Sequence, residues 1–522
     1  MANLIKVSRG PRNFFRLASV ARTLARYDVL SALSTLNIPP FLLALIRLAA
    51  FPVRPLANLP AQPGERLAEA FVALGPSFTK LGQTLATRAD LLGAAIAADL
   101  SRLQDSLSPF PSAEAKATVT QELGLPLEAI FRRFDDTPIA AASIAQVHFA
   151  ETIEGVPVAV KILRPGIEAA FRRDLDLFMW VAETIERAYP ASRRLKPREV
   201  VRTLEAVVAT ELDLRLEAAA AAELAENFTN DPTFIVPKVD WQRTAQRVLT
   251  IQRINGIRID RIDNLRAAGH DPNDILRRCA EAFFKQAFRD GFFHADMHPG
   301  NMFVRSDGAL APVDFGIMGR LDRKTRYFLA EMLIGFLTGD YMRVAEVHFH
   351  AGYVPADQSL PLFAQACRAI GEPIRGRPQE EISIARLLGQ LFQVTAQFRM
   401  ETQPQLLLLQ KTMLVAEGIG RILNPHANMW QLAQPLMEEW MRENRGPEAR
   451  LVETIKGIRE ILDRLPRFVT AAEIAATRIA ESSIKLDPTI IQASYGNGMR
   501  RLKYISWIAL AIAGAALLIA LS

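Results

Sequence analysis

Residues 294–301 read HADMHPGN and residues 313–316 read VDFG. Their polar members are the residue types that phosphoryl transfer needs. The carboxylate of Asp314 and the amide oxygen of Asn301 are hard oxygen ligands, which Mg²⁺ prefers, and together they can bracket the ion that accompanies a triphosphate. Asp296 can then accept a proton from an attacking hydroxyl group or water. The two segments therefore predict a site for a magnesium-bound nucleotide.

A hairpin is expected between these segments. The strand-like pieces 302–304 and 310–313 flank a turn at Ser306-Asp307-Gly308, which would bring Asn301 close to Asp314. An Asp five positions before an Asn, followed by Asp-Phe-Gly on the next hairpin, is the arrangement of a protein-kinase catalytic loop. The sequence thus predicts an α+β, protein-kinase-like fold with two lobes that is mostly helical.

The upstream part of a kinase nucleotide site is recognisable, with one departure. Residues 158–161 read VAVK, so Lys161 matches the strand lysine that contacts ATP phosphates. The loop before it, residues 140–147, reads AAASIAQV where a kinase has G-x-G-x-x-G-x-V. Alanine reaches positive φ only at a cost, and its Cβ hinders close approach of the backbone, so a stiffer loop is expected. The predicted ATP contacts are Ala140, Ala142, Ser143, Ala145, Val147 and Lys161.

An acidic residue on the helix after the strand must pair with Lys161. Residues 167–228 are predicted to be helical, and Glu211 and Glu217 are the candidates. They are six positions apart and do not share a helical face, whereas Asp213 and Glu217, four apart, do. The sequence leaves open which of the two glutamates pairs with Lys161.

The net charge of +6 is concentrated at the N-terminus of the 522-residue chain. The first thirty residues carry one acid, Asp28, and a series of bases interleaved with apolar residues. The bases are Lys6, Arg9, Arg12, Arg16, Arg22 and Arg26. Such a segment fits either an anionic lipid surface or an ordinary solvated helix. The sequence contains no basic stripe with interleaved aromatic residues, so nucleic acid is not expected as a partner.

Residues 504–521 read YISWIALAIAGAALLIAL, with no charge and no proline. As a helix they would span about 27 Å, close to the hydrocarbon thickness of a bilayer. Arg500, Arg501 and Lys503 precede the run, so the positive-inside rule predicts a single-pass C-terminal anchor with the bulk of the chain in the cytoplasm. Ala511 and Ala515 form a small-residue face on which two such helices could pair, so a homodimer is one expected arrangement.

The chain resembles the UbiB family of atypical protein-kinase-like ATPases. The resemblance covers about residues 10–430 and rests on the alanine-rich loop, the H-x-D-x-H-P-G-N segment, the Asp-Phe-Gly and two further motifs. The K-x-G-Q motif is present at residues 80–83 and the E-x-D motif at residues 211–213. The resemblance implies ATP and Mg²⁺ as cofactors and a role in ubiquinone biosynthesis at a bacterial-type inner membrane. It also implies polyprenylphenol intermediates, or the enzymes that handle them, as partners.

The resemblance implies further that the helices around K-x-G-Q pack over the active site. Lys80 and Gln83 would approach the nucleotide pocket and meet the acids of E-x-D, Glu211 and Asp213. Such an extension favours ATPase or small-substrate chemistry over ordinary protein phosphorylation. Two departures from the family are apparent. Bacterial members generally carry two C-terminal membrane helices, whereas one clear span is found here. The linker between the lobes, where a glutamate is frequent, reads Ile251-Gln252-Arg253-Ile254.

The predicted organisation has five parts. These are a basic segment at 1–55, a K-x-G-Q extension at 56–130, a kinase-like small lobe at 131–255, a helical large lobe at 256–485, and a linker with a transmembrane helix at 486–522.

Three other functions compete with the ATPase. A small-molecule phosphotransferase of the aminoglycoside or choline kinase type would lack the K-x-G-Q extension. A 2-polyprenylphenol 6-hydroxylase, a label often given to the family, would need a dinucleotide or iron motif, and none is evident. A nucleotide-sensing scaffold without turnover is the third.

Overall fold

The computed structural model describes most of the chain before residue 427. The described residues are 2–29, 53–57, 59–86, 96, 99–100, 103, 108–188, 197–373, 394, 397–400, 404–426, 432, 435–436, 439–440 and 442. Apart from Arg442, all of them belong to the first of two compact units, Met1–Trp440.

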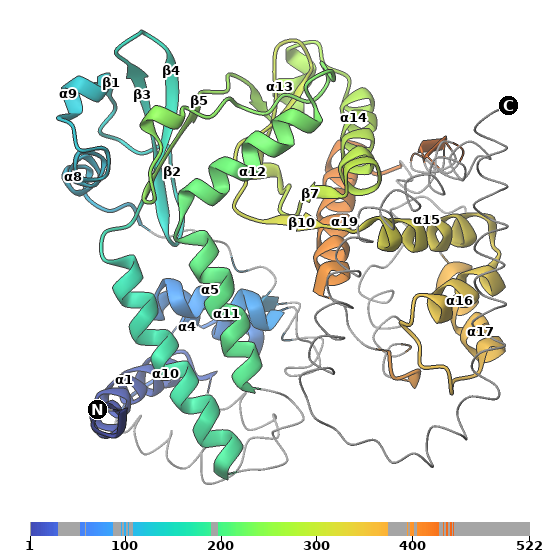
Figure 1. Ribbon diagram of the computed structural model, residues 1–522, viewed down its shortest axis with the longest axis horizontal. Helices are drawn as coiled ribbons and strands as arrows, with labels where there is room; N and C mark the ends of the chain where they lie inside the picture. Colours follow the sequence, from blue (N-terminus) through green and yellow to red (C-terminus); the bar gives the residue numbers. More distant parts are fainter. Residues whose placement is uncertain are drawn as a thin grey trace, which may run out of the picture. The chain divides into compact units, whose positions relative to one another are not determined.

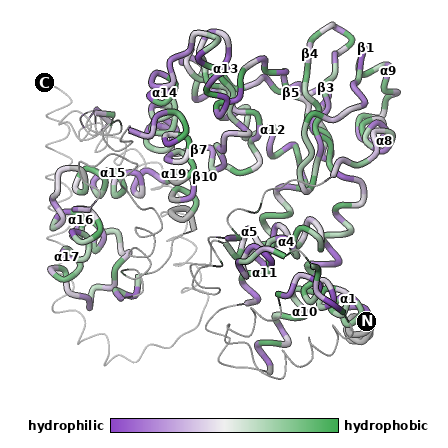
Figure 2. Tube along the Cα trace, turned by 180° about the vertical axis from the view of Figure 1, so that it is seen from behind, coloured by the Kyte–Doolittle hydropathy of each residue, from purple (hydrophilic) through white to green (hydrophobic). Residues whose placement is uncertain are grey.

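An antiparallel sheet forms the centre of the small lobe, with strand order β1-β3-β4-β5 and β2 paired to β3. Its strands are β1 (Phe131–Phe134), β2 (Ala140–Ala141), β3 (Ala145–Thr152), β4 (Pro157–Leu163) and β5 (Val248–Gln252). Figure 1 shows β3 and β4 as a long hairpin, and Figure 2 shows β4 as largely hydrophobic. The hairpin turns at Gly155, where φ is +83° and glycine is favoured.

Two small sheets in the large lobe surround the segments 294–301 and 313–316. One has the order β6-β8-β9 and the other pairs β7 with β10. The strands are β6 (Ile257–Arg258), β7 (Phe292–His294), β8 (Met302–Val304), β9 (Leu310–Pro312) and β10 (Met318–Arg320). In the β8–β9 hairpin Val304 is opposite Leu310, and Gly308 in the turn has a φ of +78°. The hairpin expected from the sequence is therefore present.

Helices account for most of the remaining described residues. Those of the N-terminal half are α1 (Ala2–Arg26), α4 (Pro63–Leu74), α5 (Pro76–Ala86), α8 (Ser112–Leu123), α9 (Leu127–Ile130), α10 (Ile167–Ala188), α11 (Pro197–Glu211) and α12 (Leu214–Asn227). Those of the C-terminal half are α13 (Ile262–Ala267), α14 (Pro272–Phe284), α15 (Arg323–Thr338), α16 (Tyr341–His350), α17 (Leu360–Gly371) and α19 (Pro404–Leu423). A π-helical turn, Lys285–Asp290, continues α14 toward β7.

The helical structure expected over residues 167–228 is present as α10, α11 and α12, with residues 189–196 outside the described residues. A break between α11 and α12 falls inside E-x-D. Glu211 ends α11, and Asp213 is the N-cap of α12, where its carboxylate accepts a hydrogen bond from the backbone N–H of Arg215 at 3.2 Å. An Asp that caps a helix satisfies one of the free N–H groups of its first turn, which stabilises a new helix start at this position.

The extension shares a hydrophobic core with the small lobe. Buried residues of α4 and α5, among them Phe71 and Phe78, belong to one cluster with Phe178 of α10 and with Leu249 and Ile251 of β5. The rings of Phe78 and Phe178 meet edge to face with centroids 4.9 Å apart. Since the cluster is continuous, the extension is fixed to α10 and to the sheet through side-chain packing.

The predicted membrane segment cannot be compared with the structure, since residues 504–521 lie outside the described residues. The rest of the predicted linker and membrane segment, from residue 486, and the end of the predicted large lobe, from residue 443, lie outside them too. Over the described ranges, no helix combines the length and the apolar character needed to cross a bilayer.

Candidate active site

Lys161 on β4 holds together the centre of the site. Its Nζ atom donates hydrogen bonds to both carboxylate oxygens of Glu217 on α12, at 2.8 and 3.0 Å, and to Oδ2 of Asp314 at 3.1 Å. The side chains of Lys161 and Glu217 are 16% and 7% exposed, whereas that of Asp314 is 40% exposed. The site is therefore a buried ion pair with one carboxylate at its open edge.

Burial and the neighbouring charges shift the pKa values of these groups. Burial opposes the charged form of Lys161, but the carboxylates of Asp314 and Glu217 outweigh it and raise its pKa. Burial, together with the charge of Asp314, raises the pKa of Glu217 to about 7 against the lowering effect of Lys161. The pKa of Asp314 is lowered because Lys161 and the N–H of Gly316 outweigh its burial. Lys161 is thus a cation that faces one acid with a lowered pKa, Asp314, and one with a pKa raised to about 7, Glu217.

The break between α11 and α12 separates the two candidate glutamates. Glu217 lies one turn inside α12 and faces Lys161, whereas Glu211 ends α11 and accepts a hydrogen bond from Lys80 of α5 at 3.0 Å. The Lys80 and Glu211 side chains are only 6% and 8% exposed. The geometry therefore assigns Glu217 to the strand lysine and Glu211 to the K-x-G-Q helix.

The other two residues of these motifs make different contacts. Asp213 binds Arg215 with both carboxylate oxygens, at 2.8 and 2.7 Å. The Nε2 atom of Gln83 is 3.5 Å from the backbone oxygen of Leu103. The expectation that Asp213 and Glu217 share a helical face was wrong, because Asp213 precedes the first residue of α12 as its cap.

The catalytic loop is ordered by its own side chains. Nδ1 of His294 accepts a hydrogen bond from the backbone N–H of Asp296 at 3.1 Å, and Nδ1 of His298 accepts one from Gly300 at 3.0 Å. Burial lowers the pKa of His294, so the neutral imidazole that accepts this bond is favoured. The amide nitrogen of Asn301 donates to the backbone oxygen of Asp296 at 3.3 Å. Asp296 and Asn301 are thereby fixed relative to each other.

The Asp-Phe-Gly segment is tied to α12. The N–H of Phe315 is 3.3 Å from Oε1 of Glu217, and the ring of Phe315 is buried. The N–H of Gly316 donates to Oδ1 of Asp314 at 3.0 Å. Val313, the residue before Asp314, donates its N–H to the backbone oxygen of Asn301 at 3.0 Å, so the hairpin places Asn301 and Asp314 side by side.

This arrangement fits a magnesium ion bound together with phosphates. Asn301 bonds through its amide nitrogen, which leaves its oxygen as the ligand atom, and Asp314 adds a half-exposed carboxylate. Magnesium usually takes one or two protein ligands and completes its shell with phosphate oxygens and water. In the described part of the chain, no group of three or more His, Cys, Asp or Glu residues is placed to hold a metal without a nucleotide.

The alanine-rich loop forms a tight hairpin turn between β2 and β3. The N–H of Ala142 donates to the oxygen of Ala145 at 2.7 Å, and none of the loop's residues has a positive φ. Alanine therefore fits the turn without backbone strain. Ser143 is fully buried, so the phosphate contact predicted for its hydroxyl group would need the turn to open. Ala140, Ala142 and Val147 are at least partly exposed, whereas Ala145 is buried.

One residue of the site was missed by the sequence analysis. Lys411 on α19 donates a hydrogen bond from Nζ to Oδ1 of Asp296 at 3.0 Å. A sequence signal was available, because Lys411 is the only charged residue of the apolar run 404–415, PQLLLLQKTMLV. A single charged side chain in such a run must either form an ion pair or be exposed to solvent.

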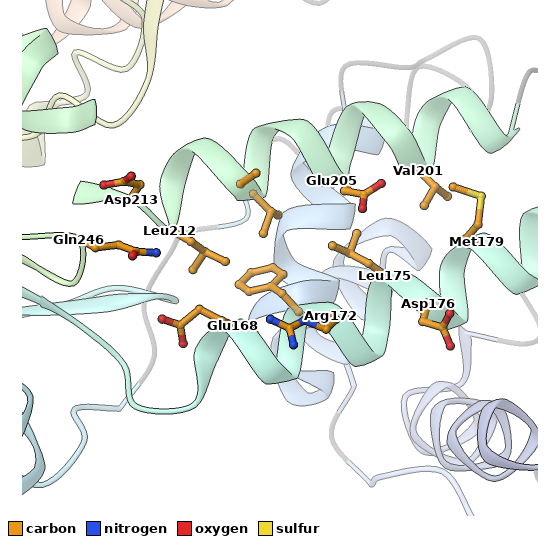
Figure 3. Close-up of a pocket in the computed structure, with 13 residues that line it drawn as sticks. Glu168, Arg172, Leu175, Asp176, Met179, Val201, Glu205, Leu212, Asp213 and Gln246 are labelled. Carbon is orange, nitrogen blue, oxygen red and sulfur yellow. The ribbon is translucent and has the colours of Figure 1, made fainter. Parts of the chain in front are cut away.

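A separate cavity of about 590 Å³ lies between α10 and α11. Figure 3 shows Glu168, Arg172 and Asp176 along α10, with Glu205 and Val201 on α11. Its lining is apolar in the middle and charged around it. The lining residues are Glu168, Phe171, Arg172, Leu175, Asp176, Met179, Val201, Glu205, Val208, Ala209, Leu212, Asp213 and Gln246. Because Leu212 and Asp213 line it, the cavity reaches the junction of α11 and α12.

Two protein-family models match the chain. The ABC1 atypical kinase-like domain matches residues 102–348, and the UbiB helical domain matches residues 367–428. The first match contains Lys161, Glu217, Asp296, Asn301 and Asp314, and the second contains Lys411.

Curated relatives match over nearly the whole chain. A Marinobacter nauticus protein named "Probable protein kinase UbiB" is 39% identical over 511 residues, which are 96% of this chain and 93% of the relative. A Pseudomonas aeruginosa protein of the same name is 40% identical over 474 residues, 90% of this chain and 88% of the relative. A solved structure of a Mycobacterium tuberculosis protein in complex with erythromycin is 25% identical, with a TM-score of 0.47, and the match covers 72% of this chain and 91% of that one.

Proposed function

The chain belongs to the UbiB family of atypical kinase-like proteins, and on that basis we propose that it hydrolyses or transfers the terminal phosphate of Mg-ATP in support of ubiquinone biosynthesis at a membrane. This family membership argues against the alternative that the chain is a small-molecule phosphotransferase of the aminoglycoside or choline kinase type. The substrate of the phosphoryl transfer is proposed to be water or a small molecule.

The single observation that carries this proposal is the Lys161 cluster. Lys161 lies within hydrogen-bond distance of Glu217 and Asp314, and Asn301 lies beside Asp314 on the hairpin. With Mg-ATP bound, Lys161 would contact the α- and β-phosphates, and Asp314 and Asn301 would hold the Mg²⁺, which would supply positive charge to the phosphates. When the attacking oxygen bonds to the γ-phosphorus, the bond from that phosphorus to the bridging oxygen of ADP breaks. Asp296 takes the proton of the attacking group.

The packing of the extension supports ATPase or small-substrate chemistry over protein phosphorylation. The Lys80–Glu211 pair is nearly enclosed, and α5 shares a core with α10 and β5. An extension fixed in this way cannot move aside without exposing apolar surface and separating two charges, both of which are unfavourable. We propose that it stays in place during turnover and restricts access to the site.

A membrane setting is proposed from the chain's two ends. Residues 504–521 carry no charge and are mainly apolar, and α1 has exposed bases, among them Arg22 and Arg26, as well as the exposed rings of Phe14 and Phe15. Polyprenylphenol intermediates are strongly apolar, so an ATPase that helps present them to enzymes must act at a bilayer. We propose the bacterial inner membrane, with residues before 500 on the cytoplasmic side.

A nucleotide-sensing scaffold is the second candidate, and one observation favours it. Asp314, the predicted metal ligand, is paired with Lys161, and Asp296, the predicted catalytic acid, is paired with Lys411. A site closed by its own ion pairs could bind nucleotide as a signal and turn over slowly or not at all.

The test is Mg²⁺-dependent ATP hydrolysis by the full chain in liposomes, with and without a phenolic mimic of a quinone precursor. We expect turnover that rises with lipid and phenol and that is lost in Asp314→Asn. A matched control is Asp357→Asn, which removes an exposed acid far along the chain. ATP binding without turnover would favour the scaffold, and absence of ATP binding would contradict both candidates. Removal of residues 500–522 tests the anchor, and unchanged quinone production at native expression would count against it.

A further inference from the structure

α19 reaches back to the catalytic loop across a large interval of sequence. The Nζ atom of Lys411 lies 3.0 Å from Oδ1 of Asp296, a residue 115 positions earlier. Lys411 belongs to the region that matches the UbiB helical domain, whereas Asp296 belongs to the region that matches the kinase-like domain. The contact therefore joins two parts of the family's architecture at a proposed catalytic residue.

Packing of α19 determines where Lys411 lies. The helix contacts α14 and β10, and Leu409 and Thr412, on either side of Lys411, are buried. Near its C-terminal end, Asn424 donates to the side-chain oxygen of Asn273 at 2.7 Å. Because the helix is held at several points, the lysine is presented to the loop by the fold, and the ion pair with Asp296 is not its only support.

The catalytic loop itself supplies no permanent cation. Residues 294–301 contain no Lys or Arg, and the Nδ1 atoms of His294 and His298 accept backbone hydrogen bonds. Lys161 pairs with Glu217 and Asp314, and the proposed function assigns it to the α- and β-phosphates, not to the γ-phosphate. Phosphoryl transfer develops negative charge on the oxygens around the γ-phosphorus, and a cation near the attacking group stabilises it.

We propose that Lys411 is a catalytic residue that binds the terminal phosphate of ATP. This inference rests on the proposed function. An ammonium group has three N–H donors, so Lys411 can bond a γ-phosphate oxygen while one donor stays on Asp296. The side chains of Lys411 and Asp296 are 45% and 28% exposed, so a ligand can reach both. Charge-assisted bonds of this kind are stronger than neutral ones.

Comparison of ATP with ADP separates this role from a structural one. If Lys411 only orders Asp296, its replacement should change the dissociation constants of Mg-ATP and Mg-ADP equally, because neither nucleotide would touch the lysine. If Lys411 binds the γ-phosphate, its replacement should weaken the binding of Mg-ATP alone, because ADP lacks that phosphate. The dissociation constants of Mg-ATP and Mg-ADP should be measured by calorimetry on the full chain in detergent or nanodiscs, for the wild type and for Lys411→Met, Lys411→Arg and Arg421→Met.

We expect Lys411→Met to weaken Mg-ATP binding by roughly 10- to 100-fold and to leave Mg-ADP binding unchanged. Lys411→Arg should retain most of the preference for ATP, since it keeps the charge. Arg421→Met removes a charge from the same helix about 15 Å away and should change neither constant. An equal effect of Lys411→Met on both nucleotides, or no effect on either, would overturn the proposal.

The outcomes also distinguish this inference from the proposed function. If the wild type binds ATP and hydrolyses it but Lys411→Met shows no selective loss, only the role of Lys411 fails. If the wild type binds neither nucleotide, the proposed function fails and the inference fails with it. Melting temperatures of the four proteins, measured without nucleotide, show whether a loss reflects folding. A Lys411→Met protein that is unfolded would be replaced by Lys411→Gln, which keeps a polar group at the position.

Discussion

Glu217 accepts hydrogen bonds from the Nζ atom of Lys161 on both of its carboxylate oxygens, at 2.8 and 3.0 Å. One of these oxygens is also 3.3 Å from the N–H of Phe315. A single carboxylate thus connects strand β4, helix α12 and the Asp-Phe-Gly segment. The position of α12 and the conformation of that segment are therefore coupled through Glu217.

Replacement of Glu217 should impair the site more than replacement of Glu211. Glu217→Gln leaves Lys161 with Asp314 as its carboxylate partner and weakens the tie to Phe315. We expect kcat/KM for ATP to fall at least tenfold, as for the loss of one charged positioning group. Glu211→Gln leaves the Lys161 contacts in place and should reduce kcat/KM less. Steady-state ATP hydrolysis measures both, and a larger loss with Glu211→Gln would contradict the assignment.

The titration of Glu217 should appear in thermal stability. Burial, aided by the charge of Asp314, raises its pKa to about 7 from the ordinary glutamate value of 4.5. The folded protein then binds this proton more tightly than the unfolded chain. The stabilisation is complete at low pH and is lost as the pH rises from about 4.5 to about 7. Relative to Glu217→Gln, which cannot ionise, the melting temperature of the wild type should fall across this interval and level off above it. A difference that stays constant with pH would contradict the raised pKa.

The Lys80–Glu211 pair should behave as a buried ion pair. Lys80→Met or Glu211→Leu alone leaves the other charge nearly enclosed, and we expect each to cost roughly 3–5 kcal/mol of unfolding free energy. The double variant should recover much of that loss, because no isolated charge remains. Arg187→Met provides the control, since its pair with Glu183 is exposed and worth at most about 0.5 kcal/mol. Chemical denaturation measures all four, and a double variant less stable than either single one would refute the expectation.

Glycine in the alanine-rich turn should change how the site binds nucleotide. Ala142→Gly removes a Cβ and loosens a turn that now closes with a 2.7 Å hydrogen bond. We expect higher ATP affinity or a release of suppressed phosphotransfer, with a stability cost of about 0.5–1 kcal/mol. Ala268→Gly, at the exposed end of α13, controls for the general effect of glycine. An unchanged ATP dissociation constant together with unchanged turnover would count against the idea.

The parts of the site that follow from local sequence were predictable. The β8–β9 hairpin has its turn at Gly308, so its strands and turn residues were enough to infer that Asn301 lies next to the Val313-Asp314 segment, where the N–H of Val313 bonds the oxygen of Asn301. The strand of Lys161 was also recognisable from local sequence, because its valine-rich run is typical of a β-strand. Family motifs added Lys80 and Glu211, whose contact involves residues 131 positions apart.

The remaining contacts depend on where helices break and how they pack. The choice between Glu211 and Glu217 could not be made while residues 167–228 were treated as one helix, because the cap at Asp213 turns the two acids toward different neighbours. That Asp, followed by a helical run, was the available signal. The contact of Lys411 depends on the packing of α19 against α14, which no spacing within the catalytic loop could indicate.

The contact of Lys411 with Asp296 bears on how this architecture can be inherited. One charged group comes from the stretch that matches a kinase-like domain and the other from the stretch that matches a helical domain. Recombination that exchanged either module for a foreign one would separate the two halves of the pair and leave a charge without its counterpart at the reaction centre. Lineages that retain this chemistry should therefore transmit the two modules as one unit, and substitutions at the two positions should arise together.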